Sequence, residues 1–191
     1  IMAEYVICYM LMHERNVLQC FALQKRKQWK MPKPGLLRGK RVGIMGAGSI
    51  GTAIAGAAKF FKMLTSGYSR IPSPRASIDQ MFGPDQLLEF VEDLDYLISV
   101  LPDTPDTVHL IDNTVFNAMK PEAVLINVGR GNAVDETALV NALNRKEIAG
   151  AVLDVFQHEP LPKSHPFWET AGLIITSHKS ALTYPEDIAP L

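Results

Sequence analysis

The chain of 191 residues has 47% hydrophobic and 20% charged side chains, a composition typical of a globular protein with one full core and a small appendage. Its net charge of -1 gives no reason to expect nucleic acid or an anionic membrane as a partner. No stretch reaches the roughly 18 uncharged apolar residues that span a bilayer, and no signal-peptide pattern is present. Cys8 and Cys20 match no metal-ligand spacing, so we expect buried, reduced thiols, no metal site and a cytoplasmic location.

The first segment has apolar residues at helical spacing over residues 3–30, which predicts one long leading helix. Its end, QKRKQWK, is basic and is expected to face solvent. The sequence MPKPG (31–35) then ends the helix, because proline lacks an amide donor and restricts the residue before it. We interpret this stretch as a linker or domain boundary.

From residue 40 onward, short apolar strands alternate with helices. Strands are predicted at 41–45, 63–68, 96–101, 124–128, 150–156 and 173–176, and helices at 49–61, 84–94 and 135–148. Apolar strands separated by helices are typical of a parallel sheet that is covered on both faces. Right-handed crossovers then predict a doubly wound α/β domain of the Rossmann type over residues 31–176.

The first predicted strand runs into IMGAGSIG, which holds the pattern G-x-G-x-x-G at a strand-to-helix junction. Gly46 permits the turn, Gly48 lets the backbone approach a pyrophosphate, and Gly51 lets the helix pack on the strand. The amides of Ser49 and Ile50 would point at the anion from the helix N-terminus. This context favours dinucleotide binding over a purely structural turn.

The residues after the second predicted strand bear on which dinucleotide is bound. An NAD-binding unit usually has a carboxylate there for the ribose hydroxyls, about 20 residues after the glycines. This chain has Ser69 and Arg70 instead, and its nearest acid, Asp79, lies beyond a loop. A guanidinium binds a 2′-phosphate that a carboxylate would repel, so we expect NADP, with NAD as the second choice. The alternative reading of Arg70 is a surface arginine in a permissive loop.

Polar residues follow the last three predicted strands. Arg130 lies between glycines, Asp154 and Glu159 come with the next strand, and His178 follows the last. The carboxyl ends of parallel strands share one edge, so these side chains can converge on one cleft. There a guanidinium can bind a 2-oxo acid, and a histidine can protonate its carbonyl oxygen as hydride reaches the carbon. A neighbouring glutamate orients the ring and favours its protonated form.

Each of these residues also has a structural interpretation, since a lone arginine in a turn or a lone histidine in a loop is usually solvated and inert. We assign the remaining histidines to that class: His13, His109, His158 and His165.

In this order the motifs resemble the D-isomer-specific 2-hydroxyacid dehydrogenases, in particular their glyoxylate/hydroxypyruvate reductase branch. The similarity covers nearly the whole chain, through AEYV, GxGxxG, LPDTPDTVHLI, NVGRGNAVDE, LDVFQHEPLP and SHKSA. The resemblance implies that Arg130 binds the substrate, that Glu159 supports the histidine and that His178 is the acid/base. It further implies that Asp154 contacts the nicotinamide amide, and that the cofactor is lined by Leu101, Pro102, Val128 and Gly129.

The resemblance also implies an activity and an assembly. Members of this branch reduce small 2-oxo acids such as glyoxylate or hydroxypyruvate to D-2-hydroxy acids, and some carry a similar serine–arginine pair and use NADP. The leading helix and the cofactor domain form the dimer contact in the family, so a homodimer is expected. Residues 1–30 would be the interdomain and dimerisation helix, and 177–191 the start of the return to a substrate domain that this chain lacks.

Two residues depart from the family pattern beside the histidine. Ser177 precedes it, where proline is usual, and Lys179 follows it, where an apolar or amide residue is usual. The sequence leaves open whether Lys179 opposes a protonated His178, meets an acidic substrate or points to solvent. Two other hypotheses also stay open: an NAD(H)-sensing corepressor with the same arginine, glutamate and histidine, and a dehydrogenase of another class that shares only the fold.

Overall fold

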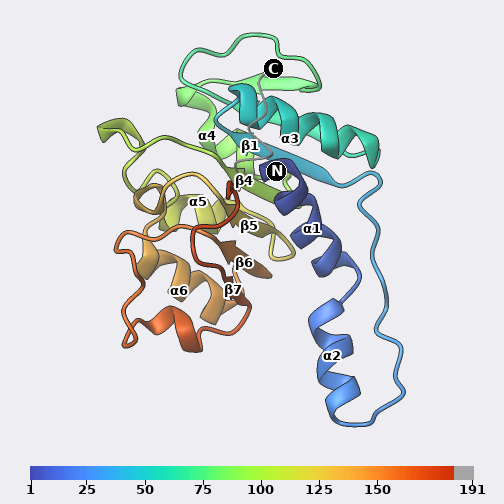
Figure 1. Ribbon diagram of the computed structural model, residues 1–191. Coiled ribbons are helices and arrows are strands. Elements are labelled where there is room, and N and C mark those ends of the chain that lie inside the picture. The colour runs from blue at the N-terminus through green and yellow to red at the C-terminus, as the bar shows by residue number, and fades with distance from the viewer. Residues whose placement is uncertain (183–191) are drawn as a thin grey trace.

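The computed structural model describes residues 1–182, which form a doubly wound parallel sheet with helices on both faces (Figure 1). The strand order is β3-β2-β1-β4-β5-β6-β7, and every neighbouring pair is parallel. The strand order changes direction between β1 and β4, where folds of this kind bind ligands. The predicted fold class is confirmed. The strands are β1 (Arg41–Met45), β2 (Leu64–Tyr68), β3 (Gln80–Phe82), β4 (Tyr96–Ser99), β5 (Val124–Asn127), β6 (Gly150–Leu153) and β7 (Leu173–Ile175).

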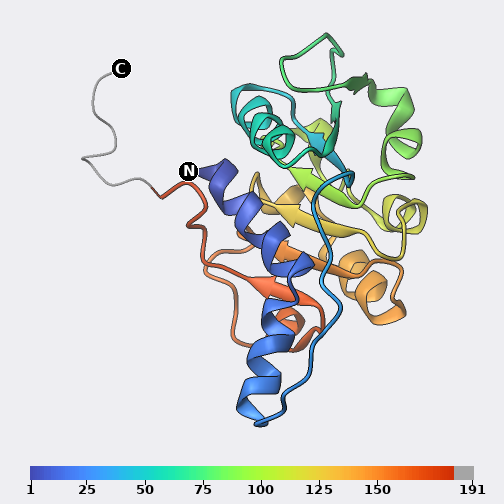
Figure 2. The same cartoon turned by 90° about the vertical axis from the view of Figure 1, so that its right-hand side faces the viewer.

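The helices divide between the two faces of the sheet (Figure 2). One face carries α1 (Met2–Glu14) and α3 (Ser49–Phe60). The other carries α4 (Leu87–Val91), α5 (Asn113–Ala118) and α6 (Glu136–Arg145). Short 3₁₀ helices lie in the connections between these elements: η1 (Pro84–Gln86), η2 (Pro105–Thr107), η3 (Gly131–Ala133) and η4 (Pro166–Glu169). No helix within residues 1–182 is both long and apolar enough to cross a membrane.

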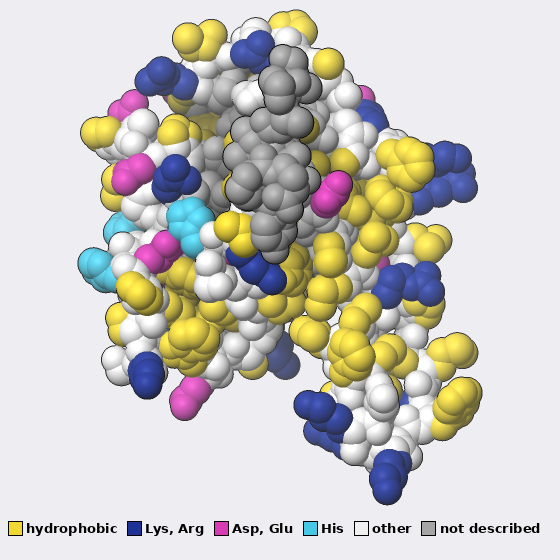
Figure 3. All heavy atoms as spheres, in the orientation of Figure 1, with side chains coloured by type: hydrophobic (Ala, Val, Ile, Leu, Met, Phe, Trp, Pro, Cys, Tyr) yellow, Lys and Arg dark blue, Asp and Glu magenta, His cyan; other side chains and the backbone are white. Residues whose placement is uncertain are grey.

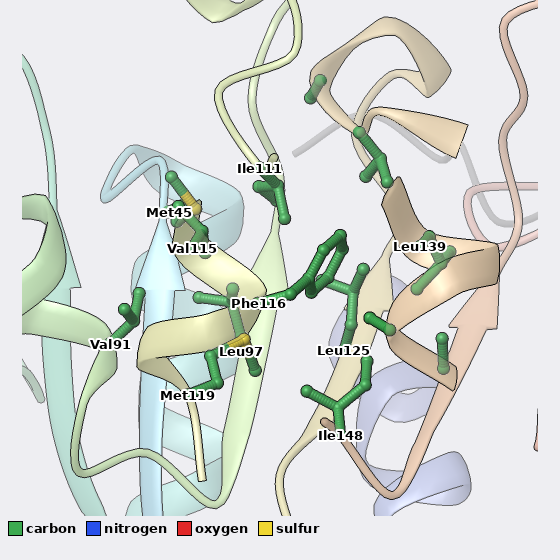
Figure 4. Close-up of a cluster of buried hydrophobic side chains, with 14 of the residues drawn as sticks. Met45, Val91, Leu97, Ile111, Val115, Phe116, Met119, Leu125, Leu139 and Ile148 are labelled. Carbon is green, nitrogen blue, oxygen red and sulfur yellow. The ribbon is translucent and has the colours of Figure 1, made fainter. Parts of the chain in front are cut away.

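The two faces have separate apolar cores because successive side chains of a strand point to opposite sides. Leu125 of β5 packs toward Phe116 of α5 and Leu139 of α6, as Figure 4 shows. Its neighbour Ile126 packs on the opposite side in the cluster that contains Ile54 of α3. All four residues of β4, β5 and β6 are buried, which explains their continuous apolar sequence. These strands fix the positions of the loops that follow them.

The prediction of one long leading helix is wrong. Helix α1 ends at Glu14, Asn16 takes a left-handed conformation with φ of 52°, and a separate helix α2 (Val17–Lys25) follows. Asparagine tolerates this conformation better than most residues. Whereas α1 buries Val6 and its neighbours against the sheet, α2 buries no residue and projects from the body of the molecule (Figure 1).

The cysteines also differ from expectation, since Cys8 and Cys20 are both exposed free thiols. Cys8 lies on the side of α1 that faces away from the core, and Cys20 lies on the projecting α2. A burial prediction from apolar composition failed here because the segment does not pack along its whole length.

Three elements were missed or shortened. Strand β3 has only three residues, too few for a clear pattern, and α5 has six. The start of α5 is nevertheless well defined, because the Asp112 carboxylate accepts hydrogen bonds from the amides of Thr114 and Val115. The helix predicted at 84–94 is in fact η1 followed by the short α4.

Candidate active site

The residues singled out from the sequence lie on loops that leave the carboxyl edge of the sheet. Backbone hydrogen bonds continue the strand ladder into these loops: Gly46 N donates to Tyr68 O, Val128 N to Ser99 O and Asp154 N to Asn127 O, each at 3.0 Å. The loops after β1, β5 and β6 are therefore held at the same edge by the sheet itself, as the strand pattern predicted.

The glycine loop between β1 and α3 needs its glycines for three different reasons. Gly46 has φ of +100°, a conformation that side chains disfavour. A Cβ on Gly51 would lie 2.2 Å from the Gly46 carbonyl oxygen, so the helix could not pack there. A Cβ on Gly48 would meet nothing within 4 Å and would project into open space. This space is where the backbone can approach a ligand.

The N-terminus of α3 opens onto the same space. Gly48 is the N-cap and supplies no side-chain hydrogen bond to the first amides of the helix, which include those of Ser49 and Ile50. Free amides and the helix dipole favour an anion at this position. A groove of about 390 Å³ runs along the loop, and it is lined by Gly46, Ala47, Gly48, Ser49, Ile50, Gly51, Ser69, Arg70, Ile71, Arg75, Val100 and Pro102. The donor set and the open cradle fit a dinucleotide with its pyrophosphate on the helix.

The far end of the groove contains Ser69 and Arg70 and no carboxylate from β2. The Ser69 hydroxyl donates to Ile71 O at 2.9 Å. Asp79 instead binds the amide of Thr65 near the start of β2, at the other end of the strand. Burial opposes ionisation of Asp79, but hydrogen bonds from Lys59 and Thr65 outweigh it and lower the pKa of its carboxyl. Asp79 therefore binds Thr65 and Lys59 away from the groove, and its carboxylate does not line the groove.

The loop that carries Arg130 is packed tightly between two others. A Cβ on Gly129 would lie 2.6 Å from Leu101 N, and a Cβ on Gly131 would lie 2.0 Å from Phe156 C. These glycines therefore let the loops after β4, β5 and β6 meet backbone to backbone, while Arg130 between them stays exposed. The Arg130 guanidinium donates to Gly129 O at 2.8 Å.

Asn127 shapes this turn and was not identified from the sequence. It is fully buried, its amide nitrogen donates to Arg130 O at 3.0 Å, and its amide oxygen accepts from Gly129 N at 3.1 Å. A polar residue at the end of the otherwise apolar run VLIN was the available signal, since a buried amide needs partners.

His178 and Glu159 come together as expected. His178 Nδ1 lies 2.7 Å from Glu159 Oε2, and the other carboxylate oxygen accepts from Phe156 N at 2.9 Å. With an ionised carboxylate as acceptor, Nδ1 carries the proton and donates it, so Nε2 is the nitrogen available for proton exchange. The imidazole is half exposed and the Glu159 side chain is one-third exposed, so the pair is open to a ligand.

Asp154 lies beneath the histidine loop and is fully buried. Its carboxylate accepts hydrogen bonds from the Thr176 hydroxyl, from Lys179 N and from Ser180 N. Burial alone would raise the pKa of Asp154, but these hydrogen bonds outweigh it and lower the pKa. His178 N donates to Asp154 O at 2.8 Å, and His178 itself has φ of 53°. Asp154 therefore shapes the loop that presents the imidazole, a role that the sequence did not reveal.

The lining residues expected from the resemblance divide by exposure. Leu101, Val128 and Gly129 are buried, whereas Pro102 is exposed and borders the groove. Thr107 Oγ1 donates to Pro102 O at 2.8 Å and so fixes this loop.

Three of the other four histidines contact neighbouring side chains, and the fourth is exposed. His165 contacts Glu136 at 3.2 Å, His109 contacts Gln157 at 3.1 Å, and His13 packs edge-on against Tyr96. His158 is exposed. No group of three or more potential metal ligands occurs within residues 1–182.

Comparisons with known proteins agree with this geometry. The model of the D-isomer specific 2-hydroxyacid dehydrogenase, NAD binding domain family matches residues 7–180. A glyoxylate/hydroxypyruvate reductase A from Serratia proteamaculans (strain 568) is 34% identical over 185 residues, which cover 97% of this chain and 59% of that protein.

Two solved structures are similar over the same region. One is a D-isomer specific 2-hydroxyacid dehydrogenase family protein from Aeromonas salmonicida, with a TM-score of 0.93 and 41% identity, covering 97% of this chain and 60% of that chain. The other is an NADPH-dependent glyoxylate/hydroxypyruvate reductase from Sinorhizobium meliloti in complex with NADP and sulfate, with a TM-score of 0.88 and 29% identity, covering 95% of this chain and 58% of that one. The chain thus spans about 60% of the length of these relatives.

Proposed function

Because the chain belongs to the D-isomer specific 2-hydroxyacid dehydrogenases through their NAD binding domain, we propose that it is the cofactor domain of a reductase for small 2-oxo acids. Glyoxylate and hydroxypyruvate are the substrates that we propose, because the similar proteins from Serratia and Sinorhizobium are named as reductases of these acids. The observation that carries the proposal is the His178–Glu159 pair at 2.7 Å, at the same sheet edge as the glycine loop.

The proposed chemistry divides between the side chains at this edge. A bound nicotinamide nucleotide supplies the hydride. Arg130 binds the carboxylate and carbonyl oxygens of the 2-oxo acid and orients the carbonyl carbon. His178 donates the proton at Nε2 to the carbonyl oxygen, which gives the D-2-hydroxy acid. Glu159 holds the ring through Nδ1 and so orients Nε2 for the proton transfer.

We propose NADPH as the preferred cofactor. Ser69 and Arg70 border the groove where an NAD-specific site would have an acid, and Asp79 is engaged at the other end of β2. A guanidinium without a competing carboxylate from β2 suits a 2′-phosphate. The NADP complex of the Sinorhizobium reductase supports the same choice. The alternative of an NAD(H)-sensing corepressor is less favoured, since the similar proteins are named as reductases or dehydrogenases.

The test of this function is a single-turnover assay on the 191-residue chain. The chain is first titrated with NADPH by fluorescence, and hydroxypyruvate is then added. We expect NADPH to bind and to be oxidised, and we expect His178→Ala to slow oxidation by about 100-fold or more with NADPH affinity retained. If His178→Ala oxidises NADPH as fast as the wild type, His178 has no part in the mechanism. If neither protein oxidises NADPH, the 191-residue chain does not have the proposed activity by itself.

We also propose a homodimer that forms through α2 and the segment after it. No residue of α2 is buried, and Leu18 and Phe21 are more than half exposed. Beyond the helix, Trp29 is 104% exposed and Met31 is 92% exposed. The projecting lobe in Figure 3 accordingly shows apolar and basic side chains on its surface. A second copy of the chain is the partner that we propose for this apolar surface.

A further inference from the structure

A second arginine borders the groove that the proposed cofactor site uses. Arg75 lines the same space as Gly48, Ser69 and Arg70, although it lies five residues beyond Arg70 in the sequence. Sequence reasoning assigned the 2′-phosphate to Ser69 and Arg70 alone. The structure places Arg75 in the lining of the groove, although α3, β2 and a proline-containing loop separate it from the glycines in the sequence.

The loop that carries Arg75 is held at both ends. At its start, Ser69 N donates to Phe82 O at 3.1 Å and the Ser69 hydroxyl donates to Ile71 O. At its end, Asp79 binds Thr65 N at 2.9 Å and pairs with Lys59. Two prolines, Pro72 and Pro74, restrict the backbone just before the arginine. The loop that carries Arg75 is thus anchored to the sheet at both ends.

The charges at the groove are unbalanced. Arg70 Nη1 lies 3.8 Å from Asp106 Oδ2, and both side chains are highly exposed, at 81% and 76%. Such a pair is weak because solvent screens it. Arg75 forms no ion pair among residues 1–182. Two guanidinium groups therefore face one carboxylate, which leaves a net positive charge in a chain whose overall charge is -1.

We propose that Arg75 is a second guanidinium ligand of the 2′-phosphate, and that Asp106 competes with the phosphate for Arg70. A phosphate monoester carries a charge of about -1.5 to -2 at neutral pH, so one arginine leaves it partly uncompensated and two arginines match it. Phosphate binding replaces the weak Arg70–Asp106 pair, which costs little. The inference rests on the proposed cofactor preference and deepens it.

The experiment measures dissociation constants of the 191-residue chain for NADPH, NADH, 2′,5′-ADP and 5′-AMP by calorimetry. Arg75→Ala should weaken NADPH and 2′,5′-ADP by about tenfold, since a charge-assisted contact is lost, and should change NADH and 5′-AMP less than twofold. Asp106→Asn should tighten NADPH by about twofold, as expected for removal of an exposed competitor. Arg38→Ala is the matched control, because Arg38 is an exposed arginine that does not line the groove.

The outcomes separate this inference from the proposed function. NADPH affinity that is unchanged in Arg75→Ala, or reduced as much as NADH affinity, would overturn the role of Arg75 while leaving the cofactor domain intact. Tighter binding of NADH than NADPH by the wild type would overturn the NADP preference and the inference with it. Binding of neither nucleotide by the wild type would overturn the proposed function itself.

Discussion

At the residue scale, Asp154 shows how one buried carboxylate can shape the loop that presents a proposed catalytic side chain. Its oxygens accept three hydrogen bonds from residues 176–180, so the loop that presents His178 is built around one charge. Such a carboxylate stabilises the fold only while it is ionised. Since hydrogen bonding holds its pKa below the ordinary value of 3.8, its contribution is present above about that pH and is lost as the pH falls through the lower, folded-state pKa.

Asp154→Asn should therefore lower the free energy of unfolding by roughly 1–3 kcal/mol at pH 7, because the asparagine NH₂ cannot accept the amide hydrogen bonds. The difference from the wild type should shrink as the pH falls below about 3.8, where protonation removes the same acceptors from the wild type. Urea unfolding at pH 7 and at pH 3 checks both points. Equal stability of the two proteins at pH 7 would show that the carboxylate does not support this loop.

At the element scale, α2 is the part of the structure whose role the fold itself does not explain. An isolated helix of nine residues has only marginal stability in water, and none of the nine residues of α2 is buried. Two hydrogen bonds tie its base to the returning segment: Asn16 Nδ2 donates to Lys33 O at 2.9 Å, and Gly35 N donates to Glu14 O at 2.7 Å. The base is thus fixed while the outer surface of the helix stays exposed.

If this surface is the dimer contact, Phe21→Glu should shift the protein from dimer to monomer at micromolar concentration, because a charge in an apolar interface is costly. The far-ultraviolet circular dichroism should stay close to that of the wild type, since Phe21 packs on no core. Asn144→Glu adds the same charge on the exposed side of α6 and is the control. Sedimentation velocity gives the answer, and a wild-type monomer would contradict the proposed assembly.

At the scale of the whole molecule, features set by residues close in the sequence could be predicted, and features set by contacts between distant segments mostly could not. The glycine loop and the positions of every strand except β3 along the chain could be predicted, because glycine geometry and apolar runs act locally. The pairing of Glu159 with His178 could also be anticipated, because parallel strands bring their carboxyl ends to one edge. The break at Asn16 could not, since whether a helix continues depends on what it packs against.

The hydrogen-bond partners that come from distant loops could not be predicted from the sequence. Asp154 was singled out from the sequence as a cofactor contact, but its hydrogen bonds to residues 176–180 are visible only in the folded chain. Arg75 is separated from the glycines by a strand and a proline-containing loop, so only the folded chain places it at the groove.

The claim on which the proposed function depends is that the glycine loop holds the pyrophosphate of a nicotinamide nucleotide. Gly48 tests it most directly, because its φ of -79° suits any residue and a Cβ there meets nothing within 4 Å. Gly48→Val should therefore fold normally, as thermal unfolding would verify, while its side chain occupies the space of the ligand.

The decisive measurement is the dissociation constant for NADPH of the wild type and of Gly48→Val, by titration calorimetry under the same conditions. We expect the wild type to bind and the variant to bind at least about 100-fold more weakly, because the valine displaces the phosphates from the helix amides. A folded variant that binds NADPH as tightly as the wild type would contradict the assignment of the cofactor to this loop.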